Sequence, residues 1–133
     1  MKQQINPKTI TKKQLEILLL LYRFRFLDTK NIQLLLHHKL PSRIQSWLFD
    51  LNQKDYIHQF YNKTSFVERT KPAIYCLSTK AKKILKTQKE CDPYLLGQIY
   101  REKNRSKEFR QHCCYIADLY NKMRALSAKK GQH

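Results

Sequence analysis

Glycine is nearly absent from this chain of 133 residues, which contains only Gly97 and Gly131. A loop that cradles nucleotide phosphates needs several closely spaced glycines, because its backbone must approach the phosphates. The sequence excludes such a loop, and it shows no pair of carboxylates in the pattern of an acid–base site. The eight tyrosines lack the histidine cluster that a relaxase needs for strand transfer. We therefore expect no enzymatic activity and no cofactor.

Long apolar runs are missing as well. The longest run, residues 17–22, is far shorter than the ~20 apolar residues that a membrane-crossing helix needs. The first residues are too polar for the apolar part of a secretory signal. We expect a cytoplasmic protein that makes no contact with a membrane.

The spacing of the cysteines does not indicate a metal site. None of Cys76, Cys91, Cys113 and Cys114 forms a C-x-x-C pair. His112 adjoins two of them in a predicted helix, where neighbouring side chains diverge by about 100° and rarely share one ion. We expect reduced thiols and no bound metal.

Acidic residues are few, and basic residues are abundant. The chain has 10 Asp and Glu against 27 Lys and Arg, which gives a formal net charge of +17. So basic a domain repels itself unless it meets a polyanion, and we expect that polyanion to be nucleic acid. Its length and a hydrophobic content of 41% suit one domain with a modest core and a helical extension.

Two amphipathic helices are predicted near the N-terminus, after a flexible basic arm of residues 1–9. Thr11 and Gln14 have the spacing of a capping box, which predicts a helix that ends near Phe24. Asp28 or Thr29 then caps a second helix, whose apolar side is formed by Ile32, Leu35 and Leu36.

A third helix is predicted over residues 42–53. Ser42 and Gln45 repeat the capping-box spacing, which places the N-cap of this helix at Ser42. Its apolar residues fall within one narrow arc, at Ile44, Trp47, Leu48 and Leu51. The opposite side is polar, and it carries Gln45, Ser46, Phe49, Asp50 and Gln53, with Arg43 at its flank.

The polar side of the third helix is typical of a recognition helix. A DNA major groove admits one α-helix, and the base edges there require hydrogen-bond donors and acceptors. We expect DNA contacts from Arg43, Gln45, Ser46 and Gln53, with Ser42 and Lys39 at the start of the helix. Phe49 fits either a thymine methyl group or a contact with the wing, and Asp50 fits cytosine N4 or a neighbouring arginine.

A β-hairpin is predicted directly after the third helix. Residues 56–61 and 73–77 suit two strands, because they are rich in aromatic and β-branched side chains. The tip between them carries Lys63, Arg69 and Lys71, which we expect to bind the DNA backbone. Three helices and a hairpin predict a mostly helical α+β fold, a winged helix-turn-helix domain over residues 10–90.

The last part of the chain, residues 91–128, is predicted to be helical and to pair two copies. Five residues of the helix predicted over 106–126 step by 4, 3, 4 and 3 positions, namely Phe109, Cys113, Ile116, Tyr120 and Met123. Such a heptad-like seam suits another helix, so we expect a homodimer. Residues 129–133 are predicted to be a disordered tail.

Three stretches of the sequence resemble the replication-relaxation family of winged-helix proteins, found on plasmids and other mobile elements. They are ITKKQLEILLLLYRFRFLDTKNIQLLL from residue 10, SRIQSWLFDLNQKDYI from residue 42 and AIYCLSTKAKKIL from residue 73. Phe24, residues 26–27 and Thr29 match the family's aromatic and L-T-x-x-x-L pattern. Residues 75–78 match the start of its Y-x-L-T-x-x-G pattern, although Ala81 replaces the glycine. The downstream H-x-x-x-x-x-D-L-Y pattern is matched by residues 112–120.

The resemblance implies sequence-specific binding of double-stranded DNA in plasmid or mobile-element replication, transfer or their transcriptional control. The same helices and wing are also similar to those of MarR- and PadR-type regulators. One alternative is an accessory protein that docks a replication initiator, relaxase or helicase. RNA binding ranks lower, because the sequence lacks the aromatic-rich sheet motif of single-strand binders.

Overall fold

The structure is a computed structural model that describes residues 10–61 and 71–130. Three predictions lie outside these residues. They concern the basic arm of residues 1–9, the wing-tip cations Lys63 and Arg69, and the tail from residue 131.

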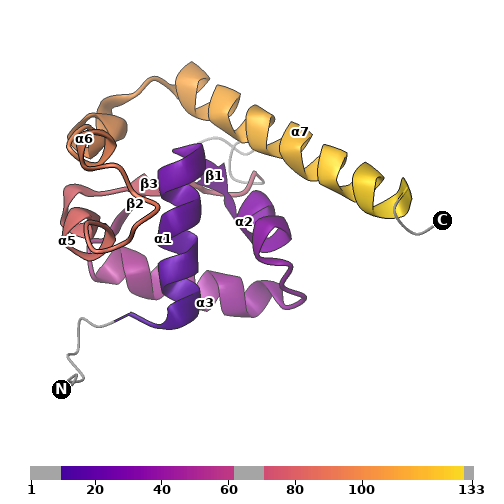
Figure 1. The fold of residues 1–133 in the computed structure, drawn as a ribbon, viewed down its shortest axis with the longest axis horizontal. Helices are drawn as coiled ribbons and strands as arrows, with labels where there is room; N and C mark the ends of the chain where they lie inside the picture. Colours follow the sequence, from indigo (N-terminus) through magenta and orange to yellow (C-terminus); the bar gives the residue numbers. More distant parts are fainter. Residues whose placement is uncertain (1–9, 62–70, 131–133) are drawn as a thin grey trace.

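Three helices form the first layer of the fold (Figure 1): α1 (Lys12–Phe24), α2 (Thr29–Leu36) and α3 (Pro41–Gln53). The capping box at the start of α1 is confirmed, because Thr11 accepts from the backbone of Gln14 and the Gln14 side chain accepts from the Thr11 backbone. Asp28 caps α2 by accepting from the Asn31 backbone at 2.8 Å. Local sequence signals thus define where the first two helices start.

The predicted start of α3 is wrong. The helix begins at Pro41, its N-cap is Leu40, and no side chain caps it. Proline suits the first helical position because its φ is already that of a helix. A backbone N–H at this position has no partner within the helix, so none is lost when proline stands there. Ser42 therefore lies inside the first turn, exposed to solvent, and its hydroxyl has no capping role.

A three-stranded antiparallel sheet forms the second layer. Its strands are β1 (Leu27–Asp28), β2 (Ile57–Phe60) and β3 (Ile74–Leu77), in the order β1-β3-β2. Strand β1 was not predicted, because two residues are too few to show an alternating pattern. Three helices, a hairpin and this additional strand confirm the predicted winged helix-turn-helix fold.

The sheet has apolar contacts on both faces, because side chains alternate along each strand. Tyr75 and Leu77 of β3 face the core formed with α1, α2 and α3. Ile74 and Cys76 face the opposite way and pack in a second cluster with Phe26. The sheet is therefore the middle layer of the fold.

The chain after β3 continues through short turns into one long helix. The segments are η1 (Thr79–Ala81), α5 (Lys82–Leu85), α6 (Pro93–Leu96), η2 (Ile99–Asn104) and α7 (Lys107–Lys130). Asp92 caps α6 by accepting from the Tyr94 backbone. Helix α7 continues beyond its predicted end at Leu126, so that residues 129 and 130, predicted to be disordered, are helical.

Helix α7 forms the third layer. Its first half covers the outer face of the sheet, where Phe109 and Cys113 pack on Phe26 and Cys76. Its second half runs past α2 and projects from the body of the molecule (Figure 1). In the described part of the chain, no helix is both long and apolar enough to cross a bilayer.

Candidate nucleic-acid interface

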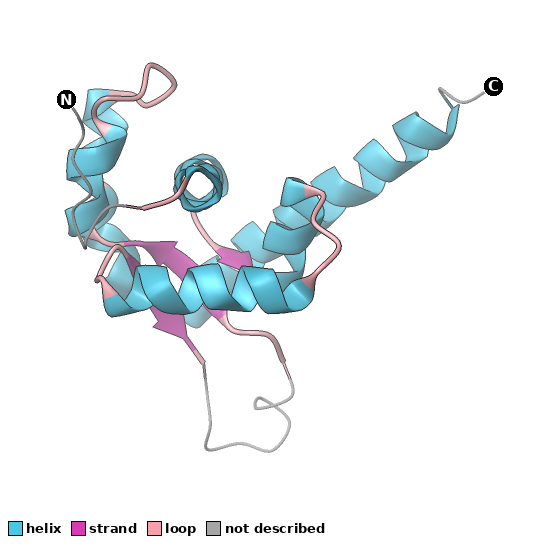
Figure 2. Cartoon of the chain, turned by 90° about the horizontal axis from the view of Figure 1, so that it is seen from below, coloured by secondary structure: helices cyan, strands magenta, loops and turns pink. Residues whose placement is uncertain are grey.

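Helix α3 presents the polar face that was predicted for it. Ile44, Leu48 and Leu51 are at most 1% exposed and pack against α1 and α2. The six residues of this helix and its start that were predicted to contact DNA are all exposed, namely Lys39, Ser42, Arg43, Gln45, Ser46 and Gln53. In Figure 2, α3 lies in front of the sheet. The helix therefore offers a row of hydrogen-bonding groups to a partner.

Phe49 lies within this polar face. Its side chain is 66% exposed. So much exposed area leaves little of the ring to pack against the described part of the wing, which was one of its two predicted roles. An aromatic ring left in solvent among polar groups is available for an apolar contact with a partner.

Asp50 is held by its own chain. The carboxylate accepts a hydrogen bond from Gln14 Nε2 at 2.8 Å and pairs with Lys54 Nζ at 2.9 Å. The bond from Gln14 and then the interactions with Lys54 lower the pKa of this carboxyl. The sequence spacing predicts only the capping-box role of Gln14, because its contact with Asp50 joins residues 36 positions apart. The ion pair offsets one negative charge beside the proposed DNA surface.

A hollow lies between α3 and the base of the wing. It has a volume of about 320 Å³, and Gln45 of α3 lines it together with Gln59, Tyr61 and Lys71 of the hairpin. Gln59 is fixed there by a hydrogen bond from its Nε2 to the Tyr75 hydroxyl, 3.1 Å long. Two predicted DNA-binding residues, Gln45 and Lys71, thus line one concave surface.

A buried polar cluster fixes α7 on α2. Asn31, fully buried in α2, donates to Asp118 Oδ1 at 2.9 Å and accepts from Asn121 Nδ2 at 2.9 Å. Sequence analysis did not single out Asn31. Its place one turn before Leu35, on the apolar side of α2, was the available signal for a buried polar contact.

A second polar contact joins α1 to η2. Arg25 donates to both carboxylate oxygens of Glu102, at 2.9 and 2.8 Å, and Glu102 is only 6% exposed. The hydrogen bonds to Glu102 raise the pKa of Arg25. Arg25 has a φ of 75°, in the region that favours glycine, and its cation lies 4.8 Å from the centre of the Phe109 ring. These contacts hold the first half of α7 against the sheet and close to the wing.

The five residues of the predicted dimer seam do not share one exposed face. Phe109 contacts Phe26 with ring centres 5.9 Å apart, Cys113 is 7% exposed, and Tyr120 packs on Phe24. These three side chains contact their own chain, because the sheet and the end of α1 occupy that side of the helix. Among the predicted seam residues, only Ile116 and Met123 are exposed.

The exposed apolar side of α7 is a different set of residues, here named the α7 stripe. It consists of Tyr115, Ile116, Leu119, Met123 and Leu126, which are between 41% and 67% exposed. The last four step by 3, 4 and 3 positions, which is the spacing of a helix-pairing seam. The stripe shares Ile116 and Met123 with the predicted seam, but it contains Leu119 and Leu126 in place of Phe109, Cys113 and Tyr120.

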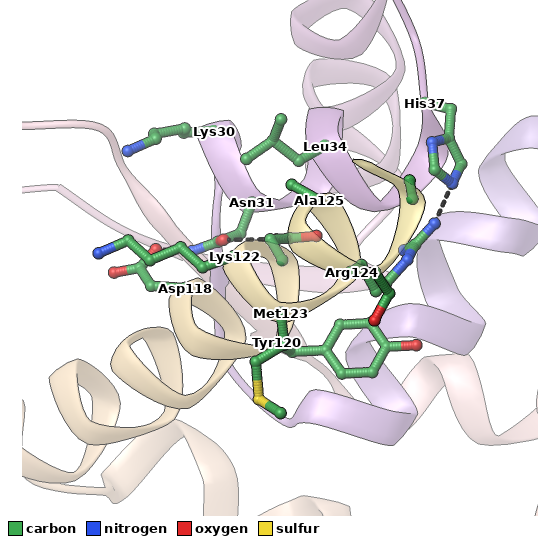
Figure 3. A pocket seen from close by; sticks show the side chains of 13 residues that line it. Lys30, Asn31, Leu34, His37, Asp118, Tyr120, Lys122, Met123, Arg124 and Ala125 are labelled. Atoms are coloured by element: carbon green, nitrogen blue, oxygen red, sulfur yellow. Dashed lines mark hydrogen bonds between the residues drawn. The ribbon is translucent and has the colours of Figure 1, made fainter. Parts of the chain in front are cut away.

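A groove of about 810 Å³ lies beside this stripe, between α2 and the second half of α7 (Figure 3). The Asn31 cluster forms one part of its wall, and the contact between His37 and Arg124 lies at one end. Met123 belongs both to the α7 stripe and to the lining of the groove. The apolar surface of α7 therefore continues from the stripe into the groove.

The cysteines are buried, and burial raises the pKa of all four thiols, to about 12 for Cys76 and Cys114. Thiols with raised pKa values are poor nucleophiles and poor metal ligands at neutral pH. His112 is exposed, whereas Cys113 and Cys114 are buried. Over residues 10–61 and 71–130, no three His, Cys, Asp or Glu side chains are placed to hold a metal ion.

No family model matches the sequence, and neither does any curated protein. Solved structures do match, among them two mutants of ZitR from Lactococcus lactis. One is 17% identical with a TM-score of 0.51, over 97% of this chain and 81% of that chain. The other is 19% identical with a TM-score of 0.52, over 96% of this chain and 80% of that chain. At so low a sequence identity, the similarity shows a shared fold, and it extends over nearly the whole chain. Membership of the replication-relaxation family stays a prediction.

Proposed function

We propose that this chain binds double-stranded DNA in a sequence-specific manner, with α3 in the major groove and the wing along the flanking backbone. The observation that carries the proposal is the row of exposed donors and acceptors on α3, Arg43, Gln45, Ser46 and Gln53, next to the wing base. Arginine suits guanine, and glutamine suits adenine, in direct readout of the major groove. The net charge of +17 supplies the attraction to phosphates that any such complex requires.

The α7 stripe supports the proposal that two copies pair. When two copies pair through these exposed apolar side chains, the side chains are removed from water, which stabilises the dimer. The net charge of +17 makes two copies repel each other over the rest of their surfaces. A two-fold dimer favours an inverted repeat whose half-sites lie about one helical turn apart. The likeness to winged-helix regulators of the MarR and PadR types, seen in the sequence, is consistent with pairing through terminal helices.

The biological process follows from the sequence resemblance alone. It indicates replication or transfer of a plasmid or mobile element, or transcriptional control of these processes. The competing role, docking of a replication initiator, relaxase or helicase, would use the wing and the exposed α7 stripe. Capture of such a protein at high salt, combined with weak DNA binding, would favour the docking role over direct DNA recognition.

The test of the DNA-binding role begins with selection of bound sequences from random duplexes, followed by shift assays on the selected site. We expect Arg43→Ala and Gln45→Ala to weaken binding to that site by about ten-fold each, because a base contact contributes roughly 1–3 kcal/mol. Binding to unrelated duplexes should fall much less. The matched control is Arg101→Ala, which removes an exposed arginine outside α3 and the wing. A wild-type protein without sequence preference, or one that prefers RNA, would contradict the proposal.

A further inference from the structure

The base of the wing has a second hollow on its other side. This hollow has a volume of about 400 Å³ and lies between the hairpin and the start of α7, where Lys107, Arg110 and Gln111 line it. Four hairpin residues line both this hollow and the one beside α3, namely Gln59, Tyr61, Lys71 and Pro72. The wing base therefore stands between Gln45 of α3 on one side and the three α7 residues on the other.

Arg110 is held in position at this hollow. Its guanidinium lies 4.3 Å from the centre of the Phe60 ring, at the end of strand β2. Its Nη1 donates to the Arg105 carbonyl at 2.9 Å, while its buried Nε has no hydrogen-bond partner in the described part of the chain. Stacking on an aromatic face fixes a guanidinium without neutralising it. The cation is thus pre-positioned beside the wing.

The surroundings of this hollow are positive. Lys107 is exposed and lines the hollow with Arg110, and Lys71 reaches the same hollow from the wing. Within the described part of the chain, Glu102 is buried and paired with Arg25, and Glu108 is exposed on α7. A partner of this surface must therefore carry negative charge.

We propose that Lys107, Arg110 and Gln111, here named the α7 clamp, bind the sugar-phosphate backbone of the same duplex that α3 reads, on the far side of the wing. The proposal rests on the proposed DNA-binding function. A duplex seated on α3 and the wing base brings its flanking backbone toward the second hollow, where two cations and an amide donate to phosphate oxygens. Such contacts fix the position of the duplex and carry no sequence information.

The experiment compares Lys107→Gln/Arg110→Gln with the matched control Lys89→Gln/Arg101→Gln, which removes the same two charges from exposed sites outside both hollows. Binding to an unrelated duplex is measured by fluorescence anisotropy between 50 and 200 mM salt. Each lost phosphate contact lowers the steepness of log affinity against log salt by about 0.9. We expect the clamp variant to lose about 1.8 from this slope, and the control to lose less than half as much.

The sequence selectivity of DNA binding distinguishes a contact with the DNA backbone from a contact with the bases. The ratio of affinities for the selected site and an unrelated duplex should stay within about two-fold of wild type in the clamp variant, because phosphates are common to all sequences. Loss of the Arg110 stacking could destabilise the clamp variant, which a lower midpoint of thermal unfolding would reveal. In that case the second variant Lys107→Gln/Gln111→Ala is used, because it changes only exposed side chains. Its slope of log affinity against log salt should still fall by about 0.9.

The result distinguishes the two proposals. If the wild type binds duplex DNA and the clamp variant keeps the slope of the control, the clamp proposal is overturned while DNA binding stands. If the wild type itself does not bind duplex DNA, the proposed function and the clamp both fail.

Discussion

At the scale of single residues, Phe49 makes the sharpest prediction about sequence reading. It lies on the outward face of α3 between Ser46 and Gln53, and it is 66% exposed. An apolar ring among base-reading groups fits the C5 methyl group of thymine, which lies in the major groove. We expect the wild type to bind about four-fold more weakly when the contacted thymine is replaced by uracil, since burial of one methyl-sized group contributes about 0.8 kcal/mol.

The Phe49→Ala variant should bind the thymine and uracil duplexes equally well. Tyr100→Ala provides the control, because Tyr100 is a similarly exposed aromatic residue, 57% exposed, away from α3. It should discriminate between the duplexes as the wild type does. A Phe49→Ala variant that retains the thymine preference would rule out this contact.

A second prediction at this scale concerns Asn31. Its amide is buried and bonded to Asp118 and Asn121, so its removal leaves polar groups of α7 without their partner. We expect Asn31→Ala to lower the free energy of unfolding by about 1–3 kcal/mol, the range for a buried hydrogen-bonding group that loses its partner. Urea unfolding followed by circular dichroism measures this change. Asn104→Ala, at an exposed asparagine, should change stability by less than about 0.5 kcal/mol.

At the scale of elements, the sequence predicted the helices from local signals and erred where tertiary contacts decide. The capping residues Thr11 and Asp28 lie next to the groups that they bind, so sequence spacing was enough to predict them. Strand β1 was missed because it exists only by pairing with β3, 46 or more residues later, as in the pair Asp28 and Ile74. Helix α3 begins at Pro41 and has no Ser42 cap, contrary to the prediction, since proline at the first helical position needs no capping partner.

The seam of α7 shows the same limit. The spacing of apolar residues predicts that a helix has an apolar side, but not which neighbour covers it. Phe109 and Cys113 are covered by Phe26 and Cys76 of the same chain. Only the fold shows that the exposed set is centred on Leu119 instead.

Substitution within the α7 stripe tests the pairing of copies. Leu119→Glu places a charge in the centre of the stripe, and burying an unpaired carboxylate costs several kcal/mol. We expect the wild type to form a dimer at micromolar concentration and the variant to be a monomer, as measured by size-exclusion chromatography with light scattering. The matched control is Leu95→Glu, because Leu95 is 51% exposed on α6, outside the stripe. A wild-type monomer would contradict the pairing, as would a Leu119→Glu variant that remains dimeric.

At the scale of the whole molecule, pairing through α7 has a geometric consequence for DNA. The Asn31 cluster fixes α7 on α2, and the Arg25 cation contacts Phe109 of α7, so two recognition helices in a dimer keep a set distance and orientation. Insertion of about five base pairs between the half-sites turns one of them by roughly half a helical turn away from its α3. We expect this insertion to lower the affinity of the wild type by about 100-fold or more in a shift assay, because one half-site is then lost. The monomeric Leu119→Glu variant binds each half-site alone, so its weaker affinity should not change with the spacing. Equal sensitivity of both proteins to the insertion would mean that the α7 stripe does not hold the two recognition helices together.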